Sequence, residues 1–147
     1  MTALPSKVES LLDDLSLFED RSERFQVLIE FADRFQEVPE RIAQCPFDES
    51  HRVKRCESDA YVWTEPLDNG TLKYHFAVEN PQGISAKAMA VILDETLSGE
   101  VPDEVLKLTP DIVFRIFGKE ISMGKGQGLM GMVDLVKYLT RQATAEQ

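Results

Sequence analysis

The sequence feature that most restricts the fold is a hairpin signature near the middle of the chain. Residues 60–64 are rich in aromatic and β-branched side chains, and residues 71–78 resume that pattern, which is typical of strands. Between the two runs lies Asp68-Asn69-Gly70, and Asp, Asn and Gly readily adopt the backbone angles of tight turns. The pattern therefore predicts two antiparallel strands joined by a short turn.

Two helical patterns precede the predicted hairpin. Ser6 and Glu9 have capping-box spacing at the start of the first helix, Asp20 and Glu23 begin the second, and Pro39 ends it. The predicted buried faces are apolar residues at helical spacing: Val8, Leu11, Leu12 and Leu15 in the first helix, and Phe25, Leu28, Ile29, Ala32 and Phe35 in the second. Residues 39–56 lose this periodicity and predict a long ordered loop, where function is often found.

Further helices are predicted after the hairpin, over residues 85–98, 103–108 and 111–117, with Gly99 closing the first of them. The last helix has the clearest apolar stripe, formed by Leu129, Met132, Val133, Val136 and Leu139. Helices around one small hairpin define an α+β fold, with the helices packed on one side of the antiparallel sheet. Because the chain has no internal repeat and no linker, residues 1–147 are expected to form a single domain.

The charge balance excludes two classes of partner. Asp and Glu number 26 against 16 Lys and Arg, a formal net charge of -10, so the protein repels phosphate backbones and anionic lipids, and neither nucleic acid nor a membrane is an expected partner. No apolar run approaches the roughly 20 residues that span a bilayer, and residues 1–16 lack the plan of a secretory signal. We therefore expect a cytoplasmic protein with free thiols.

The candidate reactive residue is Cys56, which follows Lys54 and Arg55 directly. A thiolate is the nucleophilic form of cysteine, and nearby positive charge favours it. Glu57 and Asp59 act in the opposite direction. The alternative is that Cys56 is a buried cysteine that packs as a small apolar residue.

Two other uses of the Cys and His side chains remain open. Cys45, His51, Cys56 and His75 are suitable zinc ligands, although no C-x-x-C pair occurs and their spacings match no common zinc module. His51 is also near enough in sequence to Cys56 for a Cys-His pair, which requires proximity in space. Ordinary surface or strand roles for both histidines, and a packing role for Cys45, are the simpler interpretations.

A glycine cluster, GKGQG at residues 124–128, precedes the last apolar stripe. It is not a Walker loop, because Gly118 is one residue too far from Gly124 and because Gly126 follows Lys125 where Ser or Thr is required. The simplest interpretation is a flexible loop that leads into the last helix. The alternative is that Lys125 and the free N–H groups of the helix start attract an anionic group.

The order of these elements, together with the runs VKRCESDAYVW, SAKAMAVILDETLSGEVPDEV and SMGKGQGLMGMVDLV, resembles the SufE family of sulfur-acceptor proteins (SufE and CsdE). The resemblance implies a SufE/IscU-like two-layer fold and an acceptor cysteine at Cys56. Many members have Gly before this cysteine, where this chain has Arg55, and Arg before the last helix, where it has Lys125. With too few cysteines for a cluster scaffold, the chain resembles a carrier.

The resemblance also implies the partners. A pyridoxal-phosphate cysteine desulfurase would form a persulfide, Cys56 would accept its sulfur and stimulate the enzyme, and an iron-sulfur scaffold would receive it; the cofactor belongs to the enzyme and none to this chain. Lys54, Arg55, His51 and Lys125 are the candidates for favouring the thiolate or docking the enzyme. The alternatives are a non-catalytic adaptor that activates a desulfurase and a small metal-binding protein that uses Cys45, His51 and Cys56.

Overall fold

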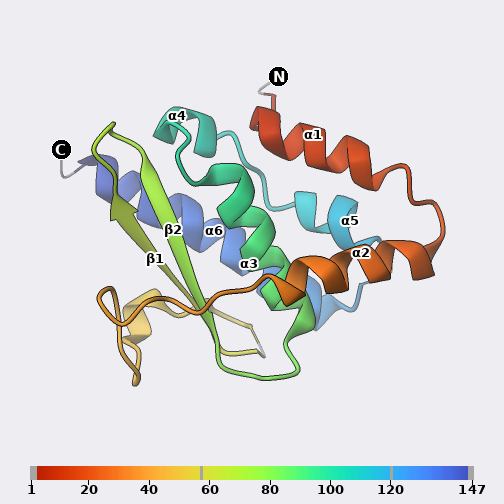
Figure 1. The fold of residues 1–147 in the computed structure, drawn as a ribbon, viewed down its shortest axis with the longest axis horizontal. Coiled ribbons are helices and arrows are strands. Elements are labelled where there is room, and N and C mark those ends of the chain that lie inside the picture. Colours follow the sequence, from red (N-terminus) through yellow and green to blue (C-terminus); the bar gives the residue numbers. More distant parts are fainter. Residues whose placement is uncertain (1–2, 57, 120, 146–147) are drawn as a thin grey trace.

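The structure is a computed structural model that describes residues 3–56, 58–119 and 121–145. Its elements are α1 (Ser6–Leu15), α2 (Arg21–Asp33), the 3-10 helix η1 (Glu49–His51), β1 (Ala60–Pro66), β2 (Leu72–Val78), α3 (Ile84–Leu97), α4 (Pro102–Val105), α5 (Ile112–Phe117) and α6 (Met123–Ala145). Figure 1 shows the hairpin lying across α3 and α6, with α1, α2 and α5 grouped beyond α3. The predicted α+β class is confirmed.

The hairpin forms where the sequence predicts it. β1 and β2 are antiparallel, with Ala60 opposite Val78 at the open end. At the turn, Gly70 has a φ of 82°, and the Asn69 side-chain oxygen accepts hydrogen bonds from the backbone N–H and the hydroxyl of Thr71. A positive φ is accessible to glycine without a steric penalty, so the Asn-Gly pair closes the hairpin.

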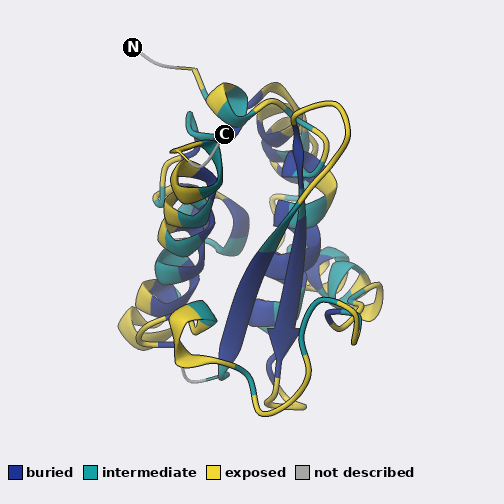
Figure 2. Cartoon of the chain, turned by 90° about the vertical axis from the view of Figure 1, so that its left-hand side faces the viewer, coloured by how far each residue is buried: buried dark blue, intermediate teal, exposed yellow. Residues whose placement is uncertain are grey.

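The two faces of the hairpin are covered by different parts of the chain. The face that packs on the helices belongs to the main core: Ala60, Val62, Leu72, Tyr74, Phe76 and Val78. Along this face β1 lies against α6 and β2 against α3. The other face carries Tyr61, Trp63 and Ala77, which pack with Val38 and Phe47 from the segment after α2. The helices therefore lie on one side of the sheet, as predicted, and both strands are buried over most of their length (Figure 2).

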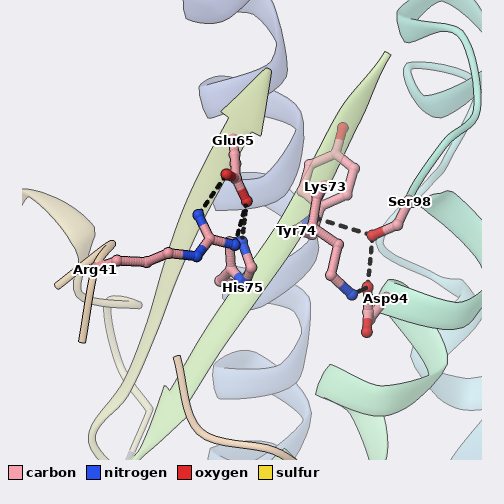
Figure 3. A network of polar contacts seen from close by, with 7 residues as sticks. All are labelled: Arg41, Glu65, Lys73, Tyr74, His75, Asp94 and Ser98. Carbon is pink, nitrogen blue, oxygen red and sulfur yellow. Dashed lines mark hydrogen bonds and ion pairs between the residues drawn. The ribbon is translucent and has the colours of Figure 1, made fainter. Parts of the chain in front are cut away.

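Charged side chains are paired on the hairpin around the distal half of β1. Figure 3 shows Glu65 accepting hydrogen bonds from Arg41, and His75 Nε2 lying 2.9 Å from a Glu65 oxygen. Next to them on β2, Lys73 donates to Asp94 of α3. These contacts tie the segment after α2 to the hairpin, and the hairpin to α3.

Some helix boundaries differ from the expectations. The Ser6–Glu9 capping box is wrong, because Pro5 occupies the N-cap of α1 and the Ser6 N–H donates to Glu104 instead. Asp20 does cap α2, accepting from the Ser22 N–H at 2.8 Å. α4 ends at Val105, three residues earlier than predicted.

The second helix is also shorter than expected. α2 ends at Asp33 because the chain then turns toward the sheet, where the Val38 N–H donates to the Phe76 carbonyl at 2.8 Å. Phe25, predicted to be buried, is 50% exposed, since it lies near the start of α2 beside open grooves. The end of α2 is thus set by pairing with the sheet, a contact that helical periodicity does not report.

The last helix begins earlier than its apolar stripe. α6 starts at Met123, so the GKGQG run lies inside the helix, and the expectation of a flexible loop there is wrong. No helix in the described ranges is long and apolar enough to cross a membrane.

Candidate functional site

Cys56 lies in a closed loop immediately before β1. The Val53 N–H donates to the Ala60 carbonyl at 2.8 Å, and Arg52 forms an isolated bridge with Tyr61. Inside this neck the Asp59 N–H donates to the Cys56 carbonyl at 3.3 Å. We call residues 53–60 the Cys56 loop; Glu57, which was expected to oppose the thiolate, lies outside the described residues.

The backbone of the Cys56 loop is strained beside the cysteine. Arg55 has a φ of 63° and Asp59 a φ of 52°, both in the left-handed region, which costs a residue with a Cβ about 1 kcal/mol. Asp tolerates this region better than most residues because its short side chain can form local hydrogen bonds. The long Arg side chain lacks this local compensation, so the chain holds a strained residue directly before its thiol.

Two glycines of α6 form the surface against which the loop rests. A Cβ added at Gly128 would lie 3.0 Å from the Cys56 Cα and 3.1 Å from the Arg55 carbonyl oxygen, and one added at Gly131 would lie 2.9 Å from the Lys54 carbonyl oxygen. Real Cβ atoms essentially never approach as closely as the Gly131 distance, and the Gly128 distances are tighter than nine in ten real Cβ contacts. The glycine cluster therefore permits close packing of the loop on the helix, and we call Gly128 and Gly131 the glycine seat.

The seat shields the thiol without sealing it. Cys56 is 9% exposed and lines two hollows. One, of about 330 Å³, is enclosed by the Cys56 loop, the start of α3 and the start of α6. The other, of about 600 Å³, is lined by Glu49 and residues 52–56. Cys56 therefore borders an open hollow on each side.

The cations predicted around Cys56 are present and accessible. Lys54 and Arg55 line the second hollow and Lys125 lines the first, and all three are exposed. None of the three forms an ion pair with another described residue, whereas Arg52 binds Asp59 at 2.7 Å. The three charges are therefore available to an incoming group.

His51 is held away from both hollows. Its Nδ1 lies 2.8 Å from the Val62 carbonyl oxygen, and its ring stacks on Trp63 with centroids 5.3 Å apart. His51 lines neither hollow at Cys56, so in this conformation it supports the loop neck from the outer face of the hairpin.

The other proposed ligands are also apart. Cys45 is exposed on the segment after α2, while His75 is buried in β2 with Glu65 as its partner. Among the described residues, no group of three or more His, Cys, Asp or Glu side chains is arranged to hold a metal ion.

Sequence reasoning missed several residues of the site. Phe25, Ser58 and Ile84 line the first hollow, and a Cβ at Gly83 would meet the Ser58 oxygen at 2.9 Å. The spacing of Gly124, Gly128 and Gly131 places them on one helical face, and this signal was available once the cluster is taken as helix.

These features define a small α+β protein that presents one shielded thiol at the end of a hairpin. Residues 9–140 match the family described as "SufE: Fe-S metabolism associated domain", and the chain belongs to this family, which is associated with iron-sulfur metabolism. It is 24% identical, over 98% of its length and 84% of the relative's, to an uncharacterised SufE-like protein of Synechocystis sp..

The fold also matches a solved structure. A hypothetical protein from Thermus thermophilus, determined in solution, has a TM-score of 0.75 and 26% identity to this chain. The match covers 97% of this chain and 99% of the other. The predicted family and fold are thus both confirmed.

Proposed function

We propose that this chain is a single-domain sulfur acceptor of the cytoplasm. It takes persulfide sulfur onto Cys56 from a cysteine desulfurase, stimulates that enzyme, and relays the sulfur to iron-sulfur cluster assembly. The observation that supports this most directly is the position of Cys56, a shielded thiol between two hollows with three accessible cations at their walls. The pyridoxal phosphate of the reaction would belong to the desulfurase.

The chemical step is a sulfur transfer between two cysteines. The Cys56 thiolate attacks the terminal sulfur of the donor persulfide, a new S–S bond forms on Cys56, and the S–S bond of the donor breaks. The donor cysteine leaves as a thiolate, so charge and electrons balance and neither an oxidant nor a reductant is consumed. As in thiol-disulfide exchange, the rate depends on the thiolate fraction and on access to the sulfur.

The cations around Cys56 have a role in this step. Lys54 and Arg55 line the hollow on one side of Cys56 and Lys125 lines the hollow on the other, where their positive charge attracts anionic groups of an incoming donor. Because they are exposed, they also meet the surface of the donor, and complementary charge speeds such encounters.

Shielding and transfer impose opposite requirements on the loop. A persulfide held against the glycine seat is protected from solvent and from oxidants, while transfer requires the sulfur to reach a partner. The strained Arg55 favours a loop that leaves the seat at a modest energetic cost, so docking of the donor releases it outward.

The test is the intact mass of the protein after incubation with a cysteine desulfurase and free cysteine. We expect the parent and Cys45→Ser to gain about 32 Da, one sulfur atom, in a form removed by reductant, and Cys56→Ser to gain nothing. Equal stimulation of the desulfurase by Cys56→Ser and the parent would instead indicate an adaptor. Stoichiometric zinc or iron in protein purified without chelator would indicate a metal-binding role.

A further inference from the structure

A third, larger concavity adjoins the hollow that Cys56 shares with the starts of α3 and α6. It has a volume of about 960 Å³ and lies where the starts of α2, α3 and α6 converge. We call it the α2 groove. Its lining includes Arg24, Phe25, Gln26, Ile84, Phe117 and Lys125.

The α2 groove is continuous with the hollow that holds Cys56. Phe25, Ile84, Ser85 and Lys125 line both, so these four residues form the boundary between the groove and the thiol. In Figure 1 the start of α6 and the start of α3 meet next to the Cys56 loop. Anything bound in the groove therefore lies against the entrance to Cys56.

Apolar side chains are exposed along the groove. Phe25 is 50% exposed and Ile84 is 40% exposed, and the half-buried Phe117 and Ile121 extend the apolar wall away from Cys56. Met123, at the start of α6, is 80% exposed. Exposed large apolar residues that gather at one place mark an interaction surface, whereas isolated ones do not.

The charge of the groove is opposite to that of the chain. Arg24 and Lys125 line it, and Asp20, the carboxylate among its described lining residues, is engaged in capping α2 through the Ser22 N–H. Arg24 donates to two carbonyl oxygens, those of Leu15 and Arg115, which leave its positive charge uncancelled. The N-terminal ends of α2, α3 and α6 also carry partial positive charge and add to this potential. A basic, apolar groove in a protein of net charge -10 selects an acidic partner with apolar side chains.

We propose that the α2 groove docks the sulfur donor, by binding an exposed segment of the desulfurase in which apolar side chains are flanked by carboxylates. This inference rests on the proposed function and adds to it a place and a chemistry for recognition. The apolar contacts hold the segment, the cations set its orientation, and the shared boundary with the Cys56 hollow brings the donor sulfur to the thiol. The groove thus governs binding, and Cys56 governs chemistry.

The sharpest test uses a charge pair at Gln26, which is exposed and lines the α2 groove but not the Cys56 hollow. Gln26→Lys and Gln26→Glu have similar helix propensities, so both variants fold alike. At low salt we expect Gln26→Glu to raise the KM for the acceptor about threefold and Gln26→Lys to lower it similarly, with kcat unchanged and the difference shrinking in about 0.5 M NaCl.

A second pair tests the apolar contact. Phe25→Ala removes the exposed aromatic ring of the groove and is expected to raise the KM about tenfold, as truncation of an aromatic anchor does. Tyr138→Ala is the matched control, because Tyr138 is 53% exposed on the same helix as Lys125 but about 20 Å further along it. It is expected to leave the KM unchanged. The rate of Cys56 alkylation by iodoacetamide reports separately on access to the thiol and is expected to be the same for both Gln26 variants and the parent.

The outcomes separate the two proposals. Direct binding of the desulfurase to Cys56→Ser, with and without the groove substitutions, tests docking even if no sulfur is transferred. If Cys56 gained sulfur and the KM were the same for the parent, the Gln26 variants and the Phe25 variant, the groove proposal would be overturned and the proposed function left intact. Tighter binding of Gln26→Glu would overturn the acidic chemistry. If the Gln26 and Phe25 variants took up sulfur like the parent but passed it on from Cys56 more slowly, the groove would be assigned to the downstream acceptor instead.

Discussion

The two ends of strand β1 are built on opposite principles. At the distal end, Glu65 is bound by Arg41 and by the buried His75. At the other end, the Cys56 loop contains a left-handed Arg55 and a thiol near exposed apolar side chains. The cations around that thiol, Lys54 and Arg55 of the loop and Lys125 of α6, have no ion partner among the described residues. One end satisfies its polar groups and stabilises the hairpin, while the other leaves strain and charge available. A well-paired strand thereby begins with a strained loop that holds the thiol.

The glycine seat offers the largest test of this contrast. Gly128→Ala is expected to lower the free energy of unfolding by about 1–2 kcal/mol, because the cost of overpacking exceeds the gain in helix propensity. The new Cβ would lie 3.0 Å from the Cys56 Cα and 3.1 Å from the Arg55 carbonyl oxygen, so the backbone of the loop must shift. Iodoacetamide should then alkylate Cys56 faster than in the parent. Denaturant unfolding and alkylation kinetics measure the two effects.

Gly126→Ala is the matched control on the same helix. A Cβ there would make only ordinary contacts, 3.7 Å from Ile121 and Phe114, and alanine is a better helix former than glycine by about 1 kcal/mol. This variant should be more stable than the parent with an unchanged alkylation rate. If the two alanine variants had the same free energy of unfolding and the same alkylation rate, the proposed role of the glycine seat would be contradicted.

The buried side of the hairpin predicts the next largest effect. The Tyr74 hydroxyl lies 2.6 Å from the Thr140 hydroxyl in the core, and burial raises the pKa of Tyr74 to about 12. Tyr74→Phe should lower the free energy of unfolding by about 1 kcal/mol and leave Cys56 alkylation unchanged.

The same tyrosine predicts alkaline sensitivity. Its folded-state pKa of about 12 exceeds the ordinary value of 10, so the folded protein binds more protons above pH 10 and the parent loses stability as pH rises from there. Tyr74→Phe should lack this part of the loss. If the parent and Tyr74→Phe lose stability in parallel above pH 10, ionisation of Tyr74 is not coupled to folding.

Strain beside the thiol predicts a smaller, stabilising change. Arg55→Gly should raise the free energy of unfolding by about 0.5–1 kcal/mol, since glycine adopts the φ of 63° without a Cβ clash. Arg55→Ala removes the same charge but keeps the Cβ, and should not be stabilised. A gain shared by both variants would assign the effect to charge and not to the backbone.

The distal pair predicts the smallest change near neutral pH, because partly exposed ion pairs contribute little. Hydrogen bonds from Arg41, and then from His75, lower the pKa of Glu65 from 4.5 to about 2. This contribution to stability is complete above pH 4.5 and is lost as pH falls through about 2.

Glu65→Gln removes that dependence on acid. The parent should therefore be the more stable protein near neutral pH, and the difference between the two free energies of unfolding should shrink as the pH approaches 2. Urea unfolding across this range measures it, and a difference that grows on acidification would contradict the assignment.

Much of the fold was accessible from the sequence because its signals are local. The Asn69-Gly70 turn, the Asp20 cap and the stripe of the last helix each depend on residues a few positions apart, and each was predicted. Both errors have their cause in long-range contacts. Val38 leaves helical register to pair with Phe76, and Glu104 accepts from the Ser6 N–H, which the Glu9 side chain would bind in the expected capping box.

The sequence by itself determined the α+β class, the family and the thiol, because hairpin and helix periodicities and the run around Cys56 are written in consecutive residues. Only the tertiary structure decided how that thiol is held. The close approach of Gly128 and the left-handed Arg55 arise from packing a loop on a helix some 70 residues later in the chain. Steric fit between distant segments depends on three-dimensional distance, which neither composition nor spacing encodes.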